Sequence, residues 1–247
     1  MDLGASWPIF RFDEIDSTNE EARRRSASGD LGPCWLAART QTAGRGRLGR
    51  DWDSPTGNLF ATALFEFQKP LTEAALVCFS AGLAVIDAAQ ALGIGAGALH
   101  LKWPNDVLAG DAKLAGILIE TGQAQGKLWM ATGFGINVAT APRRPDRPTA
   151  SLNELQGGQG KTTGETLAAL DIAFRARLSG LLSAGFSETR ADWLKHAAHI
   201  GRRVELNPVS GRIEGVMEGL AEDGALILHL ADGSTTHVRA GEISLLG

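Results

Sequence analysis

The chain has 247 residues, 44% hydrophobic and 21% charged, a balance typical of folded globular proteins that excludes wholesale disorder. Its formal net charge of −4 lacks the basic excess expected of a nucleic-acid binder, so any anion site has to be local. The two cysteines, Cys34 and Cys78, fit no metal or redox spacing and predict reduced thiols, although the sequence alone does not exclude a disulfide.

The N-terminal sequence has neither a basic start nor a long apolar run, which argues against a secretory signal. The longest apolar stretch, residues 74–92, is interrupted by Ser80, Asp87 and Gln90 and is too polar to span a bilayer. We therefore expect a cytoplasmic protein with no membrane partner.

The first part of the chain alternates helical and strand patterns. Ser17 with Glu20, or Thr18 with Glu21, has the spacing of a capping box that opens a helix. The following elements are predicted in chain order: a helix over 19–28, strands over 34–40 and 58–67, a helix over 71–92, a strand over 98–103, a hairpin over 107–121 that turns at Gly110–Asp111, and a strand over 129–138.

The later part of the chain changes from helices to short strands. Residues 141–148 are rich in proline and predict a loop inside the first domain, because the helices after it need the same core. Two domains are expected, 1–199 and 200–247, the second a small β-barrel or curled sheet. The predicted elements are helices over 163–185 and 188–199, strands over 202–206, 211–220, 225–230 and 235–240, and turns at Asn207–Pro208, Asp223–Gly224 and Asp232–Gly233.

The segment QTAGRGRLGRDW, residues 41–52, combines backbone freedom with cations. Its glycines allow close approach to a ligand, and its arginines supply rigid forks of donors suited to carboxylate or phosphate. The pattern predicts an anion clamp, although composition alone favours a solvated basic loop. It is neither the dinucleotide fingerprint nor the phosphate loop that ends in Gly-Lys-Ser/Thr.

Two further segments carry candidate polar groups, each with a plainer interpretation. Asn105 and Asp106 follow a Trp-Pro pair at a strand end, where they could contact a ligand and Asp106 could hold magnesium, or could form an ordinary turn. Lys113 begins a long apolar strand and could stabilise developing negative charge, or could be a gatekeeper at the strand's flank. His196 and His199 could share a helix face for a metal, but without a third ligand surface histidines are favoured.

Six ordered segments resemble the biotin protein ligases: DSTNEEA, QTAGRGRLGRDW, GNLFATALF, LKWPNDV, KLAGILIE and GFGINV. The resemblance runs from about Ile15 to Leu246. It implies an α+β fold, with a mixed β-sheet and flanking helices related to class II aminoacyl-tRNA synthetases and lipoate ligases, followed by a small C-terminal β-barrel. Because only about sixteen residues precede the Ser-Thr-Asn motif, we expect no DNA-binding regulation.

The resemblance also implies a reaction. The enzyme would join biotin to AMP from ATP, with magnesium, and pass biotin to a lysine of a biotin carboxyl carrier domain of a carboxylase. A homodimer is left open. The alternatives are a lipoate or octanoate enzyme of the same superfamily and a non-catalytic biotin sensor.

Site residues are carried over from the family's motifs. Arg47 would hold the activated intermediate, Lys113 would touch the biotin carboxyl and the phosphate, and Asp106 is the weaker candidate for magnesium. Biotin contacts are implied for Ser17, Thr18, Asn19, Gln41, Gly44, Arg45, Gly46, Arg47, Lys113 and Gly116, and nucleotide contacts for Arg50, Trp52, Lys102, Asn105, Asp106 and Asn137.

Overall fold

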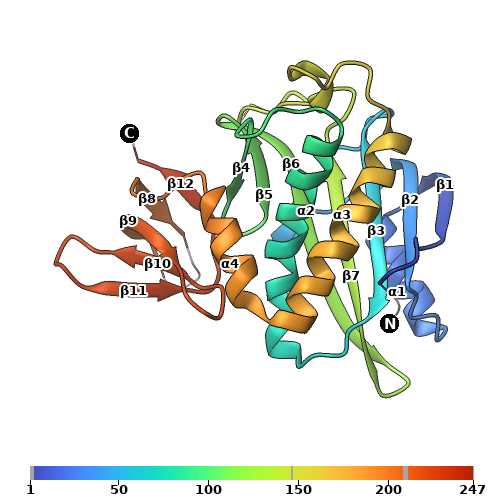
Figure 1. Ribbon diagram of the computed structural model, residues 1–247, viewed down its shortest axis with the longest axis horizontal. Coiled ribbons are helices and arrows are strands. Elements are labelled where there is room, and N and C mark those ends of the chain that lie inside the picture. Colours follow the sequence, from blue (N-terminus) through green and yellow to red (C-terminus); the bar gives the residue numbers. More distant parts are fainter. Residues whose placement is uncertain (1–2, 146, 208–210, 247) are drawn as a thin grey trace.

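The computed structural model describes residues 3–145, 147–207 and 211–246, and it contains two β-sheets (Figure 1). The larger sheet has the order β1-β2-β3-β7-β6-β5-β4. The β1–β2 pair is parallel and the other pairs are antiparallel, so the predicted mixed sheet is confirmed. Its strands are β1 (Ile9–Ile15), β2 (Cys34–Gln41), β3 (Leu59–Glu66), β4 (Leu99–Lys102), β5 (Asp106–Ala109), β6 (Ala112–Ala124) and β7 (Lys127–Ile136).

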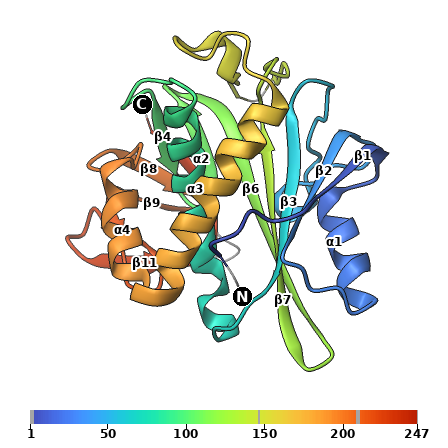
Figure 2. The ribbon, with the colours of Figure 1, turned by 45° about the vertical axis from the view of Figure 1, so that its right-hand side comes forward.

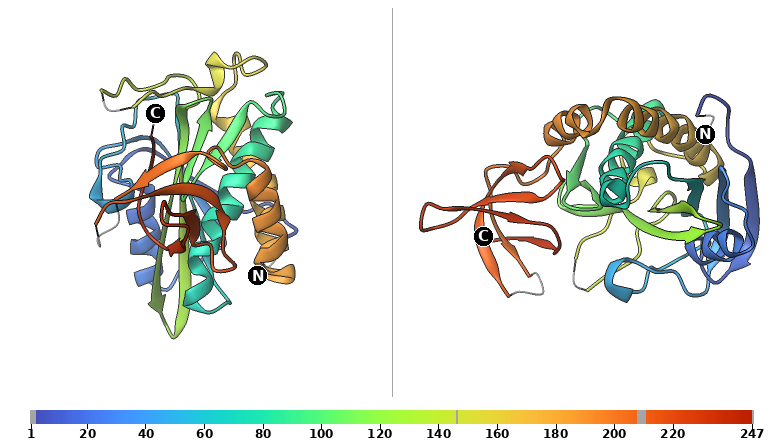
Figure 3. Two further views of the ribbon diagram at one scale, coloured as in Figure 1. Left: turned by 90° about the vertical axis from the view of Figure 1, so that its left-hand side faces the viewer. Right: turned by 90° about the horizontal axis from the view of Figure 1, so that it is seen from below.

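Helices cover both faces of this sheet. The helices α2 (Val77–Ala91) and α3 (Thr163–Ala184) pack on one face, whereas α1 (Thr18–Ala27) lies on the other (Figure 3, right). The loop after β2 lies on the same side as α1. A ligand site on that side can therefore form without interrupting the core between the sheet and α2 and α3.

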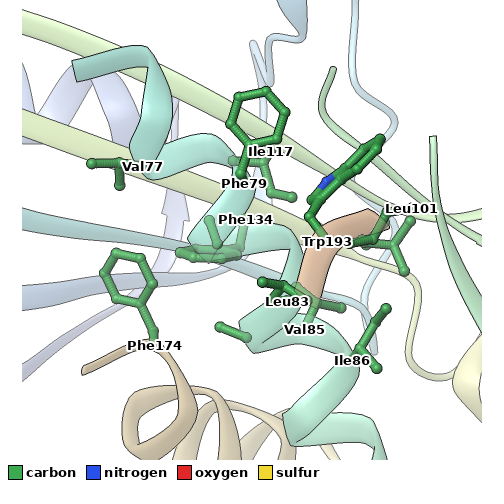
Figure 4. Close-up of a cluster of buried hydrophobic side chains, with 14 of the residues drawn as sticks. Val77, Phe79, Leu83, Val85, Ile86, Leu101, Ile117, Phe134, Phe174 and Trp193 are labelled. Atoms are coloured by element: carbon green, nitrogen blue, oxygen red, sulfur yellow. The ribbon is translucent and has the colours of Figure 1, made fainter. Parts of the chain in front are cut away.

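The main core lies between the sheet and the helices α2 and α3. Figure 4 shows Phe134 of β7 facing Phe174 of α3, whose ring centroids are 5.3 Å apart. Residues Leu71–Ala91 are long and apolar enough, by composition alone, to cross a membrane, but 72% of their most apolar window is buried inside the protein. The 3₁₀ turn Leu71–Leu76 precedes α2, so the predicted continuous helix over 71–92 is two elements.

The second sheet is antiparallel, with the order β11-β10-β9-β8-β12, and it lies beside β4 and α4 (Phe186–Lys195) (Figure 1). A hydrogen bond links the two sheets: Nε1 of Trp103, which follows β4, donates to the Gly224 carbonyl at 3.1 Å. Pro208 of the predicted turn Asn207–Pro208 lies outside the described residues. The strands are β8 (Arg203–Leu206), β9 (Ile213–Leu220), β10 (Leu226–His229), β11 (Thr235–Val238) and β12 (Ile243–Leu245).

The structure corrects the predicted start of α1. Ser17 occupies the N-cap position, but within the described residues its side chain makes no capping hydrogen bond, so the predicted capping box is wrong. Glu20 instead pairs with Arg23 of the same helix and with Arg45 of the loop after β2. The reciprocal box occurs at α3, where Glu165 N donates to Thr162 Oγ1 at 3.2 Å and Thr162 N donates to the Glu165 carboxylate at 2.9 Å.

His199 is a second correction, because its side chain is only 6% exposed. Helix α4 ends at Lys195, and the segment after it pairs with β4 through the bridge between Leu101 and Ala197. Burial lowers the pKa of His199 to about 4 from its ordinary 6.5, and the nearby Lys102 lowers it too. The expectation of a surface histidine is therefore wrong at this position.

A buried network joins β2, α3 and the N-terminal segment. Asp171 accepts a hydrogen bond from Trp35 Nε1 at 2.8 Å and forms an ion pair with Arg175 at 3.0 Å. Arg175 also donates to the carbonyls of Leu3 and Gly4. Because both ionised side chains are buried, each depends on the other to offset the loss of water.

Asp171→Ala should lower the free energy of unfolding by about 3–5 kcal/mol, because it leaves the Arg175 guanidinium buried without a counter-ion. Urea unfolding followed by circular dichroism measures the change. Glu66→Ala, which breaks the exposed pair with Lys127, is the control and should have little effect. Equal losses of unfolding free energy in the two variants would show that the buried network contributes no more to stability than the exposed pair.

Stability should also depend on His199. Between pH 6.5 and about 4 the unfolded chain binds a proton at this residue and the folded chain does not, so lowering the pH destabilises the fold, by about 3 kcal/mol in all. His199→Gln should flatten the decline of unfolding free energy over that range, whereas exchange of the exposed His237 to glutamine should not. An unchanged slope in the His199 variant would contradict the assignment.

Candidate functional site

An open pocket of about 600 Å³ lies on the sheet face that carries α1. Its walls come from the N-terminus of α1, the loop after β2, the strands β6 and β7, and residue Arg147. The structure thus brings together segments up to about 130 residues apart in the chain. Among the predicted site residues, the lining ones are Ser17, Thr18, Asn19, Gln41, Arg45, Gly46, Arg47, Arg50, Trp52, Asn105, Lys113 and Gly116.

The other predicted residues lie at different places. Gly44 lies beneath the Trp52 backbone, where an added Cβ would be 2.7 Å from the Trp52 carbonyl oxygen. Asp106 is buried behind Lys113, and Asn137 lines a smaller adjoining pocket. Lys102 does not line either pocket.

One end of the pocket is a buried polar corner. Gln41 Oε1 accepts from the Thr18 backbone N–H at 2.9 Å, and Thr62 Oγ1 lies 2.8 Å from Thr18 Oγ1 and 2.6 Å from Asn19 Oδ1. Asn19 also donates to the Glu120 carboxylate at 2.7 Å. Side chains held in this way present fixed donors and acceptors, which suits a small polar head group of a ligand.

Glycines leave the space for this pocket above the sheet. In the β6–β7 ladder Gly116 pairs with Gly135 and Leu118 pairs with Gly133, on the face turned toward α1. A Cβ at Gly133 would overlap the Asn19 amide, and one at Gly135 would overlap the Trp52 indole. The indole therefore lies directly on the strands, and within the described residues its buried Nε1 has no hydrogen-bond partner.

The arginines of the loop after β2 are held by three parts of the protein. Arg45 pairs with Glu20 of α1 at 2.9 Å. Arg47 donates to Asn105 Oδ1 at 3.1 Å and to the Gly241 carbonyl at 3.4 Å, and Arg50 donates to Glu242 at 2.8 Å. The loop is thereby drawn over the pocket, and the connection before β12 takes part in the site.

Lys113 lines the same pocket as the polar corner and the arginines. Its Nζ is 2.6 Å from Asp106 Oδ1 and 5.2 Å from the centroid of the Trp52 ring. Burial lowers the pKa of Lys113 below its ordinary value and the Arg147 and Arg50 charges act in the same direction, whereas Asp106 raises it. With a side chain this deeply buried, Lys113 does not match the alternative of an exposed gatekeeper.

The side chains of the described residues offer few ligands for a metal ion. The described residues contain no cluster of three or more His, Cys, Asp or Glu side chains placed to hold a metal. Asp106 is a lone carboxylate already paired with Lys113. Because Asp106 lines neither pocket, a magnesium ion here would take most of its ligands from phosphate and water.

Sequence reasoning missed several residues of the site. The glycines of GFGIN could have been found from their alternation along a strand, which places both on one face. Arg147 gave no comparable signal, because it lies in an irregular segment rich in proline and arginine. The missed lining residues are Asp51, Ile117, Leu118, Gly133, Phe134, Gly135 and Arg147.

Comparisons with known proteins agree with one another. Residues 12–137 match the model of the Biotin/lipoate A/B protein ligase family, and residues 199–246 match the Biotin protein ligase C terminal domain. The chain is 38% identical over 221 residues to the biotin–(acetyl-CoA-carboxylase) ligase of Paracoccus denitrificans, covering 86% of this chain and 90% of the relative. The corresponding enzyme of Mycobacterium tuberculosis is 33% identical, with 93% and 86% covered.

A solved structure shares the whole arrangement. The biotin protein ligase from Aquifex aeolicus in complex with biotin and ATP aligns with a TM-score of 0.79 and 29% identity, covering 97% of this chain and 98% of that one. The match extends over both sheets, because so little of either chain is left uncovered.

Gly135→Ala should displace Trp52 from the sheet, because the added methyl group overlaps the indole ring. We expect a large shift of the Trp52 indole N–H resonance in a ¹H–¹⁵N correlation spectrum. Gly180→Ala in α3 is the matched control, since nothing lies within 4 Å of its added Cβ, and it should leave that resonance in place. An unmoved resonance in the Gly135 variant would refute the contact.

Proposed function

Because this chain belongs to the Biotin/lipoate A/B protein ligase family, we propose that it is a biotin protein ligase, which forms biotinyl-5′-AMP from biotin and ATP and transfers biotin to a lysine of a biotin carboxyl carrier domain. The observation that carries the proposal is one pocket lined both by a buried polar corner and by the cations of Lys113, Arg47 and Arg147. The named relatives and the Aquifex complex with biotin and ATP favour biotin over lipoate.

The polar corner fits the head group of biotin. A ureido group both donates and accepts hydrogen bonds, and Ser17, Thr18 and Gln41 line the corner with hydroxyl and amide groups. Asn19 is held by Glu120 and Thr62, so we assign it to shaping the corner as well as lining it. The valeryl chain would then run along Gly116 and Gly133 toward Lys113.

The first chemical step needs cations. The biotin carboxylate oxygen attacks the α-phosphorus of ATP, an O–P bond forms, and the bond to pyrophosphate breaks. Lys113 and Arg47 would neutralise the oxygens where carboxylate and phosphate meet, in a site already formed before the charge develops. Their attachment to Asp106 and Asn105 fixes their positions.

The second step is transfer. The lysine amine of the carrier attacks the acyl carbon of biotinyl-AMP, an amide bond forms, and AMP leaves. Water competes for the same carbon, so the loop after β2, with Trp52 lying against Gly135, would exclude it until the carrier arrives.

The remaining assignments follow from position. Arg50, Trp52, Asn105 and Asn137, which line the two pockets, would contact the nucleotide, and magnesium would enter on its phosphates, with Asp106 as the weaker candidate for a protein ligand. Lys102 as a nucleotide contact, a homodimer and the domain boundary at residue 199 stay predictions. We place the enzyme in the cytoplasm, where ATP and carboxylases meet.

Mass spectrometry tests the proposal directly. Incubation with biotin, ATP, magnesium and a carrier domain of acetyl-CoA carboxylase should add one biotinyl group to a single carrier lysine. Arg47→Ala should slow formation of the adenylate about 100-fold and release it more readily, because a positioned cation is lost.

Lipoate in place of biotin is the control for substrate class. A carrier that gains lipoyl but not biotinyl mass would overturn the assignment in favour of the superfamily alternative. Adenylate formation and retention at wild-type levels in Arg47→Ala would remove the role given to that residue.

A further inference from the structure

Glu120 of β6 does not line the main pocket, but it binds a residue that does. Asn19 Nδ2 donates to the Glu120 carboxylate at 2.7 Å and to the Leu118 carbonyl at 3.4 Å. A carboxylate and a carbonyl accept hydrogen bonds and do not donate them, so the NH2 group of the Asn19 amide has to face β6. The amide oxygen of Asn19 is thereby turned to Thr62 of β3, whose hydroxyl lies 2.6 Å from it.

The sheet places the Asn19 amide between these two strands. Gly133 of β7 pairs with Leu118 of β6 and with Thr62 of β3, so the three residues form one row across the sheet. A Cβ at Gly133 would overlap the Asn19 amide, which therefore lies over the middle of this row. The amide can pass the direction of a hydrogen bond from β6 to β3, because one of its ends donates and the other accepts.

Beyond Asn19 the chain of hydrogen bonds runs through two hydroxyl groups. Thr62 Oγ1 is 2.6 Å from Asn19 Oδ1 and 2.8 Å from Thr18 Oγ1, and Thr18 Oγ1 is 3.2 Å from Gln41 Oε1. The amide oxygens at both ends only accept, so two hydroxyl protons have to serve three contacts. O–H···O bonds are about 2.5–3.0 Å long, which gives the protons to the two shorter contacts. Thr62 then donates to Asn19, and Thr18 donates to Thr62.

This direction leaves acceptors free in the polar corner. Gln41 Oε1 takes the Thr18 backbone N–H at 2.9 Å and keeps a second lone pair, and Thr18 Oγ1 keeps both of its lone pairs. Both residues line the pocket. If the chain ran the other way, Thr18 would accept from Thr62 and donate to Gln41, which would fill one acceptor position on each. A cyclic urea brings two N–H donors, so the observed direction suits it and the reverse does not.

We propose that Glu120 is a positioning residue, which fixes the direction of this hydrogen-bond chain and thereby selects a head group that carries N–H donors. The inference rests on the proposed function and adds to it a residue that acts on biotin through Asn19 without touching biotin. It also gives a reason for a carboxylate at this place on β6, since an ionised carboxylate is an acceptor only.

Glu120 has a second partner, and that partner supplies a control. Arg45 of the loop after β2 lies 3.6 Å from Glu120 but 2.9 Å from Glu20. Loss of the Glu20 carboxylate should therefore disturb Arg45 more than loss of Glu120 does, while Asn19 keeps its hydrogen bond to Glu120. The two routes to the pocket can be separated in this way.

The test compares Glu120→Leu, Glu120→Gln and Glu20→Leu by biotin-dependent release of pyrophosphate over ranges of biotin and ATP concentration. Glu120→Leu should raise KM for biotin about tenfold, the effect of one hydrogen bond to a charged group, and leave KM for ATP and kcat within about twofold. Glu120→Gln keeps an acceptor oxygen and should recover most of the loss. Glu20→Leu should raise KM for biotin less than Glu120→Leu does.

A double-mutant cycle tests the chain itself. Thr62→Val removes the middle hydroxyl with little change of shape, and it should also raise KM for biotin. Combined with Glu120→Leu it should cost no more than the larger of the two single changes, because both interrupt the same chain. Additive effects would show that Glu120 and Thr62 act separately and would overturn the inference.

Three other results would also overturn it. They are a KM for biotin within about twofold of wild type in Glu120→Leu, an equal rise of KM for biotin and for ATP, as a general distortion of the pocket would give, and an effect of Glu20→Leu as large as that of Glu120→Leu, which would assign the effect to Arg45. A wild-type enzyme that releases no pyrophosphate with biotin would overturn the proposed function itself. An active wild type with an unaltered Glu120→Leu variant would overturn only the role of Glu120.

Discussion

The site depends on the absence of side chains at one point of the large sheet. Gly116 and Gly135 are paired across β6 and β7, and the Trp52 indole occupies the space that their side chains would fill. The loop after β2 can therefore lie against the backbone of the sheet, while the opposite face of the same strands carries Ile117 and Phe134 into the core (Figure 4). Because successive residues of a strand point to opposite faces, the same two strands leave room for a ligand on one face and pack into the core on the other.

The loop after β2 is held over the pocket by contacts from distant parts of the chain. Arg45 is bound by α1, Arg47 by Asn105 after β4, and Arg50 by Glu242 in the connection to β12. The part of the chain that holds the second sheet thus supplies acceptors to the loop, and this sheet shares a core with the first, since Val204 and Met217 belong to the same buried cluster as Phe134. Each exposed ion pair is weak alone, so the loop can exchange these partners for the anionic groups of a substrate.

The sequence allowed the fold class, most elements and most of the lining residues to be predicted, because these depend on local periodicity and on contiguous motifs. Strand β1 was missed, since most of its residues are exposed at the sheet edge and show no clear alternation (Figure 2). The contact of Arg50 with Glu242 and the approach of Arg147 to Lys113 join distant segments, and no local pattern encodes them. The wrong capping box at Ser17 has a partly local origin, because the Glu20 carboxylate pairs with Arg23 of its own helix as well as with Arg45 of the loop.

The Lys113–Asp106 ion pair sets a buried ammonium beside a buried carboxylate at the site. Burial and the neighbouring arginines lower the pKa of Lys113, and the Asp106 carboxylate opposes them, which favours the charged ammonium where the chemistry needs it. A carboxylate with this task is poorly placed to serve as the main ligand of a metal as well. The excess of positive charge that remains around the pocket has to be balanced by what binds there, so the overall acidity of the chain does not hinder recognition of ATP.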